Sequence, residues 1–179
     1  TSFNIDVDVP TDSLHTQRGA HTKRSTHLLT GVAVGAAASV LLDGELVLLL
    51  VGGVAGMLPD LDLLLVPLLR RAHRSPWSHS LGASLMTTGA WLAILLVVAR
   101  WIGLEPIYQV SVSASAAVVF IASFLHSVED ALTRYGCQLL HPLSRRIYRG
   151  PFRYDDMAAN AVLLLLSLIL IMLSMLGNL

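Results

Sequence analysis

Long hydrophobic runs, separated by short polar stretches, dominate the chain from about residue 27 onward. A transmembrane α-helix needs roughly 20 consecutive apolar residues, and several of these runs approach that length. Strands do not fit the pattern, because the open edge of a sheet would leave backbone groups unpaired in lipid. The pattern therefore predicts an all-α, polytopic membrane helix bundle. About five hydrophobic helices are expected, over residues 27–42, 46–58, 75–99, 107–133 and 157–176.

Local signals set the ends of these helices and of the domain. Pro59 is expected to end the second helix, and Ser75-Pro76 is a good cap and first-turn pair for the third. Residues 1–25 are polar and irregular and lack the apolar core of a signal peptide, so they predict a mobile polar N-terminal arm. Residues 26–179 are expected to form a single membrane-embedded helical domain.

Composition supports a membrane protein and says little about partners. Hydrophobic residues make up 54% of the chain and charged residues 13%, and the formal net charge is zero. Cys137 is the single cysteine, so an intramolecular disulfide is excluded. The sequence holds no nucleic-acid-binding motif, membrane lipid is the expected partner, and the oligomeric state stays open.

The distribution of Lys and Arg predicts how the bundle is oriented. Basic residues cluster before the first helix, between the second and third, and between the fourth and fifth. By the positive-inside rule we expect these segments, and with them the N-terminus, to lie on the cytoplasmic side of the cell membrane. The basic residues are Lys23, Arg24, Arg70, Arg71, Arg74, Arg145, Arg146, Arg149 and Arg153.

Histidines and aspartates occur at the same, cytoplasmic ends of four predicted helices. Ionisable groups at membrane depth are costly and normally mark a functional site. Any one of these histidines alone would be read as an interfacial side chain bonded to a carbonyl, but the set together favours a bound metal. The candidate metal ligands are His27, Asp60, Asp62, His79, His126 and Asp130.

The spacing of these residues suits metal binding. His126 and Asp130 are four apart on a continuous helix and share a face. Asp60 and Asp62 follow a helix-ending proline, so both can turn toward one cation. Imidazole with carboxylate suits zinc, and also manganese or iron. Six donors are more than one tetrahedral zinc needs, so either one or two ions fit the set.

Glycine patterns on the first two helices favour close helix contact. Gly31 and Gly35 form one GxxxG pattern, and Gly52 and Gly56 form another. Small residues of this kind let helix backbones approach closely in lipid.

An ordered series of motifs resembles a known family. The series runs from Thr26-His27 through Pro59-Asp60-Leu61-Asp62 to Ser78-His79-Ser80, His126-x-x-x-Asp130 and His141-Pro142. In this order it resembles the YdjM family, inner-membrane proteins regulated by LexA and classed by motif as metal-dependent hydrolases. That family is in turn distantly similar to zinc-dependent phospholipase C. The present chain departs from the family at Leu63, where a histidine is usual.

The resemblance implies that the domain is hydrolase-like and that it is an enzyme. The expected reaction is hydrolysis of a phosphoester, in a lipid or lipid-linked head group at the cytoplasmic membrane surface, with one or two divalent ions, zinc first. The alternative is a metal-binding membrane protein without catalysis, in a structural, regulatory or transport role. The candidate catalytic residues are Asp60, Asp130, Glu129 and Arg74, and His73, Thr133 and His141 are candidates for supporting the ligands.

Overall fold

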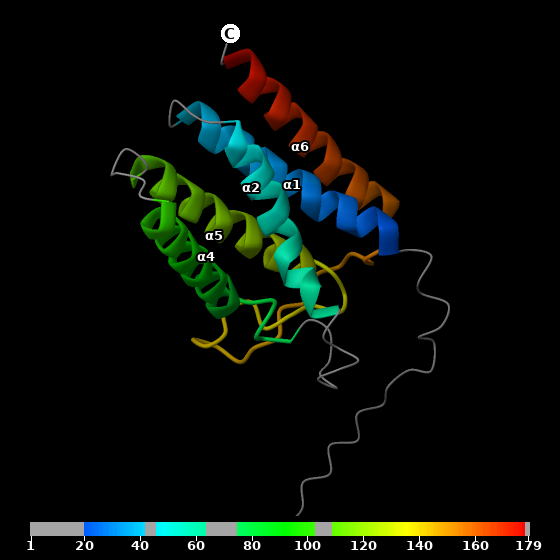
Figure 1. Ribbon diagram of the computed structural model, residues 1–179. Helices are drawn as coiled ribbons and strands as arrows, with labels where there is room; N and C mark the ends of the chain where they lie inside the picture. The colour runs from blue at the N-terminus through cyan, green and yellow to red at the C-terminus, as the bar shows by residue number, and fades with distance from the viewer. Residues whose placement is uncertain (1–19, 42–45, 64–74, 103–108, 178–179) are drawn as a thin grey trace, which may run out of the picture.

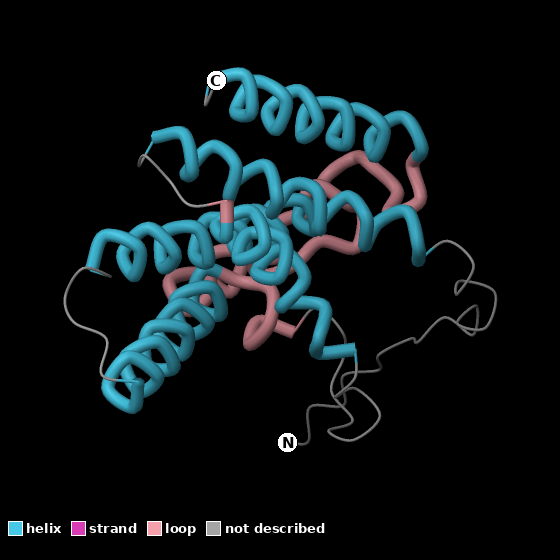
Figure 2. Tube along the Cα trace, turned by 45° about the horizontal axis from the view of Figure 1, so that its top comes forward, coloured by secondary structure: helices cyan, strands magenta, loops and turns pink. Residues whose placement is uncertain are grey.

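The structure is a computed structural model that describes residues 20–41, 46–63, 75–102 and 109–177. Within these ranges the chain is helical with connecting loops and contains no strand (Figure 2). The prediction of an all-α bundle of five helices is therefore confirmed. The elements are α1 (Ala20–Leu41), α2 (Val47–Met57), the 3-10 helix η3 (Leu58–Leu61), α4 (Leu81–Ile102), α5 (Gln109–Ala131) and α6 (Met157–Gly177).

Two helix boundaries differ from those predicted near the N-terminus and at the end of α5. Helix α1 begins at Ala20 rather than at His27, because the intervening polar residues include neither glycine nor proline and can continue the helix. Helix α5 ends at Ala131 rather than at Thr133. There the Thr133 hydroxyl donates to the Asp130 carbonyl at 2.8 Å, which closes the last turn.

The start of α4 also differs, and the difference positions a candidate ligand. Ser80 caps this helix, since its Oγ accepts a hydrogen bond from the Ala83 amide at 3.1 Å. The predicted cap at Ser75 was wrong, because residues 75–80 form a separate turn in which the His79 amide donates to the Ser75 carbonyl. His79 therefore stands just outside α4, in a turn, and not in its first helical turn.

Three helices form the centre of the bundle, and two flank it. Helices α1, α2 and α5 contact one another, α4 packs on α5, and α6 packs on α1 (Figure 1). Helices α4, α5 and α6 are each long and apolar enough to cross a membrane, and α2 with η3 is a shorter apolar helix. Large hydrophobic side chains are exposed along α4 and α6, as expected for surfaces that face lipid.

Glycines bring α1 and α2 into backbone contact, as the GxxxG patterns predict. A Cβ atom on Gly31 would lie 2.2 Å from the Gly52 carbonyl oxygen, and one on Gly52 would lie 2.1 Å from the Gly31 carbonyl oxygen. A Cβ on Gly56 would lie 2.5 Å from the His27 carbonyl oxygen. The glycine contact therefore fixes the separation of the two helices at the depth of the candidate ligands.

The candidate ligands share one end of the bundle. The N-termini of α1, α4 and α6 and the C-termini of α2 and α5 gather there, and the segment 132–156 lies across them (Figure 1). This segment supplies acceptors to the start of α4, since the Leu81 and Gly82 amides donate to the carbonyls of Leu139 and His141, each at 2.8 Å. It thereby holds the turn that carries His79.

Candidate metal centre

Four separate parts of the chain meet at the candidate site. His27 comes from α1, Asp60 from η3 and His79 from the turn before α4. His126 and Asp130 both come from α5. Within the described residues, two groups of side chains have ligand atoms close enough together to hold a metal ion, and His126 belongs to both. These groups are His27, His126 and Asp130, and Asp60, His79 and His126.

Each of the three histidines is held at its Nδ1 atom by an acceptor. His126 Nδ1 donates to the Gly56 carbonyl at 2.7 Å, and His27 Nδ1 donates to the Glu129 carboxylate. A carbonyl or carboxylate only accepts, so the proton lies on Nδ1 and the lone pair on Nε2. Such support of a ligand ring is typical of metal-binding histidines.

His79 is held in the same way through a serine. Its Nδ1 lies 2.8 Å from Ser78 Oγ, and Ser78 Oγ donates to Asp62 Oδ2 at 2.5 Å. Because the serine proton points to the carboxylate, the serine oxygen is free to accept from His79 Nδ1. Asp62 thus lies on the outer side of His79, 3.5 Å from Nδ1. The serine that links them was missed from the sequence, although its place next to His79 was a signal.

The Nε2 atoms converge with two carboxylates at the spacing of a small cation's ligands. His79 Nε2 lies 3.2 Å from His126 Nε2, and Asp60 Oδ1 lies 3.5 Å from His126 Nε2 and 3.7 Å from His79 Nε2. Asp130 Oδ2 lies 3.4 Å from His79 Nε2 and 3.9 Å from His126 Nε2. Tetrahedral zinc with bonds near 2.0–2.1 Å separates its ligand atoms by about 3.3 Å. These donors therefore fit one divalent cation.

His27 extends the site on the other oxygen of Asp130. Its Nε2 lies 3.7 Å from Asp130 Oδ1 and is buried with no hydrogen-bond partner among the described residues. The ring stacks on that of His126, with centroids 3.7 Å apart. A carboxylate that faces two sets of nitrogens with its two oxygens is suited to bridge two ions.

The charge balance of the centre also favours a cation. Four carboxylates surround three imidazoles, and Asp130 is fully buried. Burial by itself lowers the pKa of His79, but the carboxylates of Asp60 and Asp62 outweigh it and raise that pKa to about 9. The same negative environment favours a divalent cation, which needs no proton on the ring.

The remaining candidate residues have other positions. Thr133 closes α5 through the Asp130 carbonyl, and the ring of His141 packs edge-on against Trp77 with centroids 5.8 Å apart. Both support segments that carry ligands. His73 and Arg74 lie outside the described residues.

Comparison with protein families gives the chain's relationship. The family model for the YdjM inner membrane protein matches residues 22–178. The chain belongs to the YdjM family of inner membrane proteins. The resemblance seen in the ordered motifs is thereby confirmed, and family membership and the three long apolar helices agree on a membrane protein. No curated protein and no solved structure matches the chain.

Proposed function

We propose that this YdjM family member is a metal-dependent hydrolase that cleaves a phosphoester in a lipid or lipid-linked head group. The observation that carries the proposal is the convergence of the Nε2 atoms of His79 and His126 with Asp60 and Asp130 at 3.2–3.9 Å. Such a set of imidazoles and carboxylates suits zinc, manganese or iron. A second ion at His27 and the outer oxygen of Asp130 fits the same geometry.

In this proposal the histidines and aspartates that converge hold the ion, and neighbouring residues hold these ligands in place. Asp62 acts through Ser78 on His79, and the Gly56 carbonyl orients His126. A bound divalent cation would lower the pKa of coordinated water toward about 7 and polarise a phosphoryl oxygen. The reaction forms a bond from a water oxygen to phosphorus and breaks the bond from phosphorus to the leaving alcohol. A carboxylate of the site, Glu129 or one of the aspartates, would accept the water proton.

The surroundings of the site favour a substrate at the membrane surface. The centre lies toward one end of helices that are long and apolar enough to cross a membrane, so we expect it near the level of the lipid head groups. The segment 132–156 lies at this end and carries Arg145, Arg146 and Arg149, so the positive-inside rule supports a cytoplasmic position. A lipid phosphoester is the substrate class that reaches such a place.

Metal content and hydrolysis test the proposal together. We expect detergent-purified wild-type protein to contain about one or two zinc, manganese or iron ions per chain by elemental mass spectrometry. Asp130→Asn keeps the shape of the side chain but removes the charge between the histidines, so metal content and hydrolysis of phospholipids should both be lost. Asp155→Asn, at a partly exposed aspartate outside the centre, is the matched control and should retain the metal. A folded wild type without metal would overturn the proposal.

A second candidate, a structural metal, has one observation in its favour. The ligands come from α1, η3, the turn before α4 and α5, so one or two ions would join segments that lie far apart in the sequence. Metal present without hydrolysis of any phosphoester, together with unfolding on chelation, would favour this role.

A further inference from the structure

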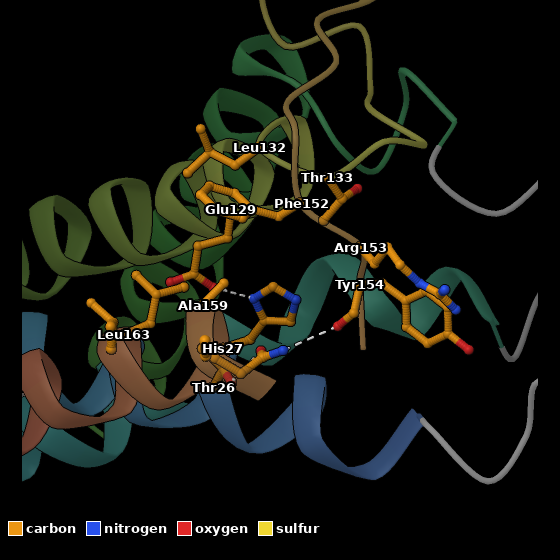
Figure 3. Close-up of a pocket in the computed structure, with 13 residues that line it drawn as sticks. Thr26, His27, Glu129, Leu132, Thr133, Phe152, Arg153, Tyr154, Ala159 and Leu163 are labelled. Atoms are coloured by element: carbon orange, nitrogen blue, oxygen red, sulfur yellow. Dashed lines mark hydrogen bonds and ion pairs between the residues drawn. The ribbon is translucent and has the colours of Figure 1, made fainter. Parts of the chain in front are cut away.

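A pocket of about 330 Å³ lies beside the candidate metal centre, between the ends of α1, α5 and α6 and under the segment that leads into α6 (Figure 3). We propose that this pocket binds one hydrocarbon chain of the lipid substrate and presents its phosphate to the centre. The assignment of that chain to a substrate rests on the proposed hydrolase function. The apolar part of the wall is formed by Leu132, Phe152, Ala158, Ala159, Val162 and Leu163.

The size and chemistry of the pocket suit a hydrocarbon chain. Cavities lined by apolar side chains stay dry and take apolar ligands, because water finds too few polar partners in them. A volume of about 330 Å³ lies at the small end of the range of ligand sites, roughly 300–1,000 Å³. One chain, and not the two chains of a phospholipid together, fits such a space.

The pocket is continuous with the surface that faces lipid. Val162 lines the pocket and is also 57% exposed on α6. Leu165 and Leu166, one helical turn farther along, are exposed as well. Leu163 lies six residues into the span that begins at Met157, which is about 9 Å along the helix. A chain in the pocket would therefore lie in the part of the bilayer nearest the head groups. It could enter the pocket from the lipid without crossing water.

The pocket shares a wall with the metal centre. His27 and Glu129, which are hydrogen-bonded to each other, both line it (Figure 3). His27 also faces Asp130 through its Nε2, at 3.7 Å. A phosphate attached to a chain in this pocket would therefore be carried to His27 and to the ligand set beside it.

A cationic side chain stands on the side of the pocket away from its apolar end. In Figure 3, Arg153 and Tyr154 lie on one side of His27 and Leu163 lies on the other. Arg153 pairs with Asp155 at 3.1 Å, but its side chain is 67% exposed, so the ion pair contributes little and a phosphate can replace it. An apolar end and a cationic end on one pocket match the two ends of a lipid phosphate.

Photolabelling of the detergent-purified full chain tests the assignment without requiring turnover. The probe is a dodecyl phosphate with a diazirine at the end of its chain, and unlabelled dodecyl phosphate is the competitor. We expect competed labelling in peptides that contain residues 129–133 and 158–163. Ala159→Trp fills the pocket and should lower this labelling by at least about tenfold. Ala161→Trp, on the exposed side of the same helix turn and outside the pocket, should leave it unchanged.

Labelling spread over the exposed faces of α4 and α6, equal in both variants, would overturn the inference. Ala159→Met is a smaller filler that replaces the tryptophan variant if the latter loses its metal and its helical circular dichroism. Metal content and hydrolysis of a water-soluble phosphate ester report the proposed function without the pocket. Metal and hydrolysis with scattered labelling would therefore remove this inference alone, whereas pocket labelling without metal would remove the proposed function.

Discussion

Helices α4 and α5 are neighbours of similar length, and each can cross a membrane, but they have different roles. Half of the spanning window of α5 is buried inside the protein, against 11% for α4. Buried residues spaced four apart along α5 form a stripe that faces α1 and α2. The stripe ends in two of the candidate ligands. The stripe consists of Ala114, Val118, Ala122, His126 and Asp130.

Helix α4 shows the opposite arrangement. Its buried residues, such as Ala83 and Ser84, lie in its first turn, and farther along it exposes Leu96, Val97 and Trp101. It supplies a ligand only through the turn before it, where Ser80 and the segment 132–156 fix the backbone of His79. Hydropathy therefore does not show which of the two helices is central and which is peripheral. The small residues along one face of α5 do show it.

The largest effect is expected from the inner end of the α5 stripe. His126→Ala removes the ligand that both groups of donors share, so metal affinity should fall by more than the 10–100-fold typical of losing a supporting residue. His141→Ala, near the start of α4 but turned toward Trp77, is the matched control. Its metal affinity should fall by no more than about 10–100-fold. Titration with zinc in a competing chelator measures both. Equal losses in the two variants would mean that α5 does not supply the central ligand.

An intermediate effect is expected where small residues permit helix contact. Gly52→Ala places a methyl group 2.1 Å from the Gly31 carbonyl oxygen, so α1 and α2 must separate, at a cost of about 1–3 kcal/mol in unfolding free energy. Gly89→Ala on α4 has no atom within 4 Å of the added methyl group and should be neutral or slightly stabilising. Thermal unfolding in detergent, followed by circular dichroism, compares them. A Gly52→Ala protein as stable as the wild type would contradict the close contact.

The smallest effect is expected at the cap of α4. Ser80→Ala removes the acceptor of the Ala83 amide and should lower the unfolding free energy by about 1 kcal/mol. Metal affinity should fall as well, because the cap holds the residue next to His79. Ser174→Ala, near the far end of α6, removes a hydroxyl that donates to the Leu170 carbonyl of its own helix and is the control. If both serines proved equivalent in zinc titration, the cap would have no part in placing His79.

The sequence by itself determined the helices and the composition of the site. Long apolar runs specify membrane helices because lipid admits no unpaired backbone, and these signals are local. For the same reason the His126 and Asp130 pair could be recognised, since four residues along a helix always share a face. The GxxxG patterns of α1 and α2 were readable too, because small residues are what close backbone contact requires.

Only the tertiary structure decided how the candidate residues are arranged around the centre. Asp62 faces the outer side of His79 through Ser78, and Glu129 holds His27, because contacts between distant segments fix which ring atom points inward. The start of α4 at Leu81 also depended on distant partners, namely the carbonyls of Leu139 and His141. The pocket beside His27 comes from three helices and a loop that meet only in space. Spacing along a chain carries information over one or two helical turns, whereas the packing of distant segments decides which side chains and ring atoms face one another.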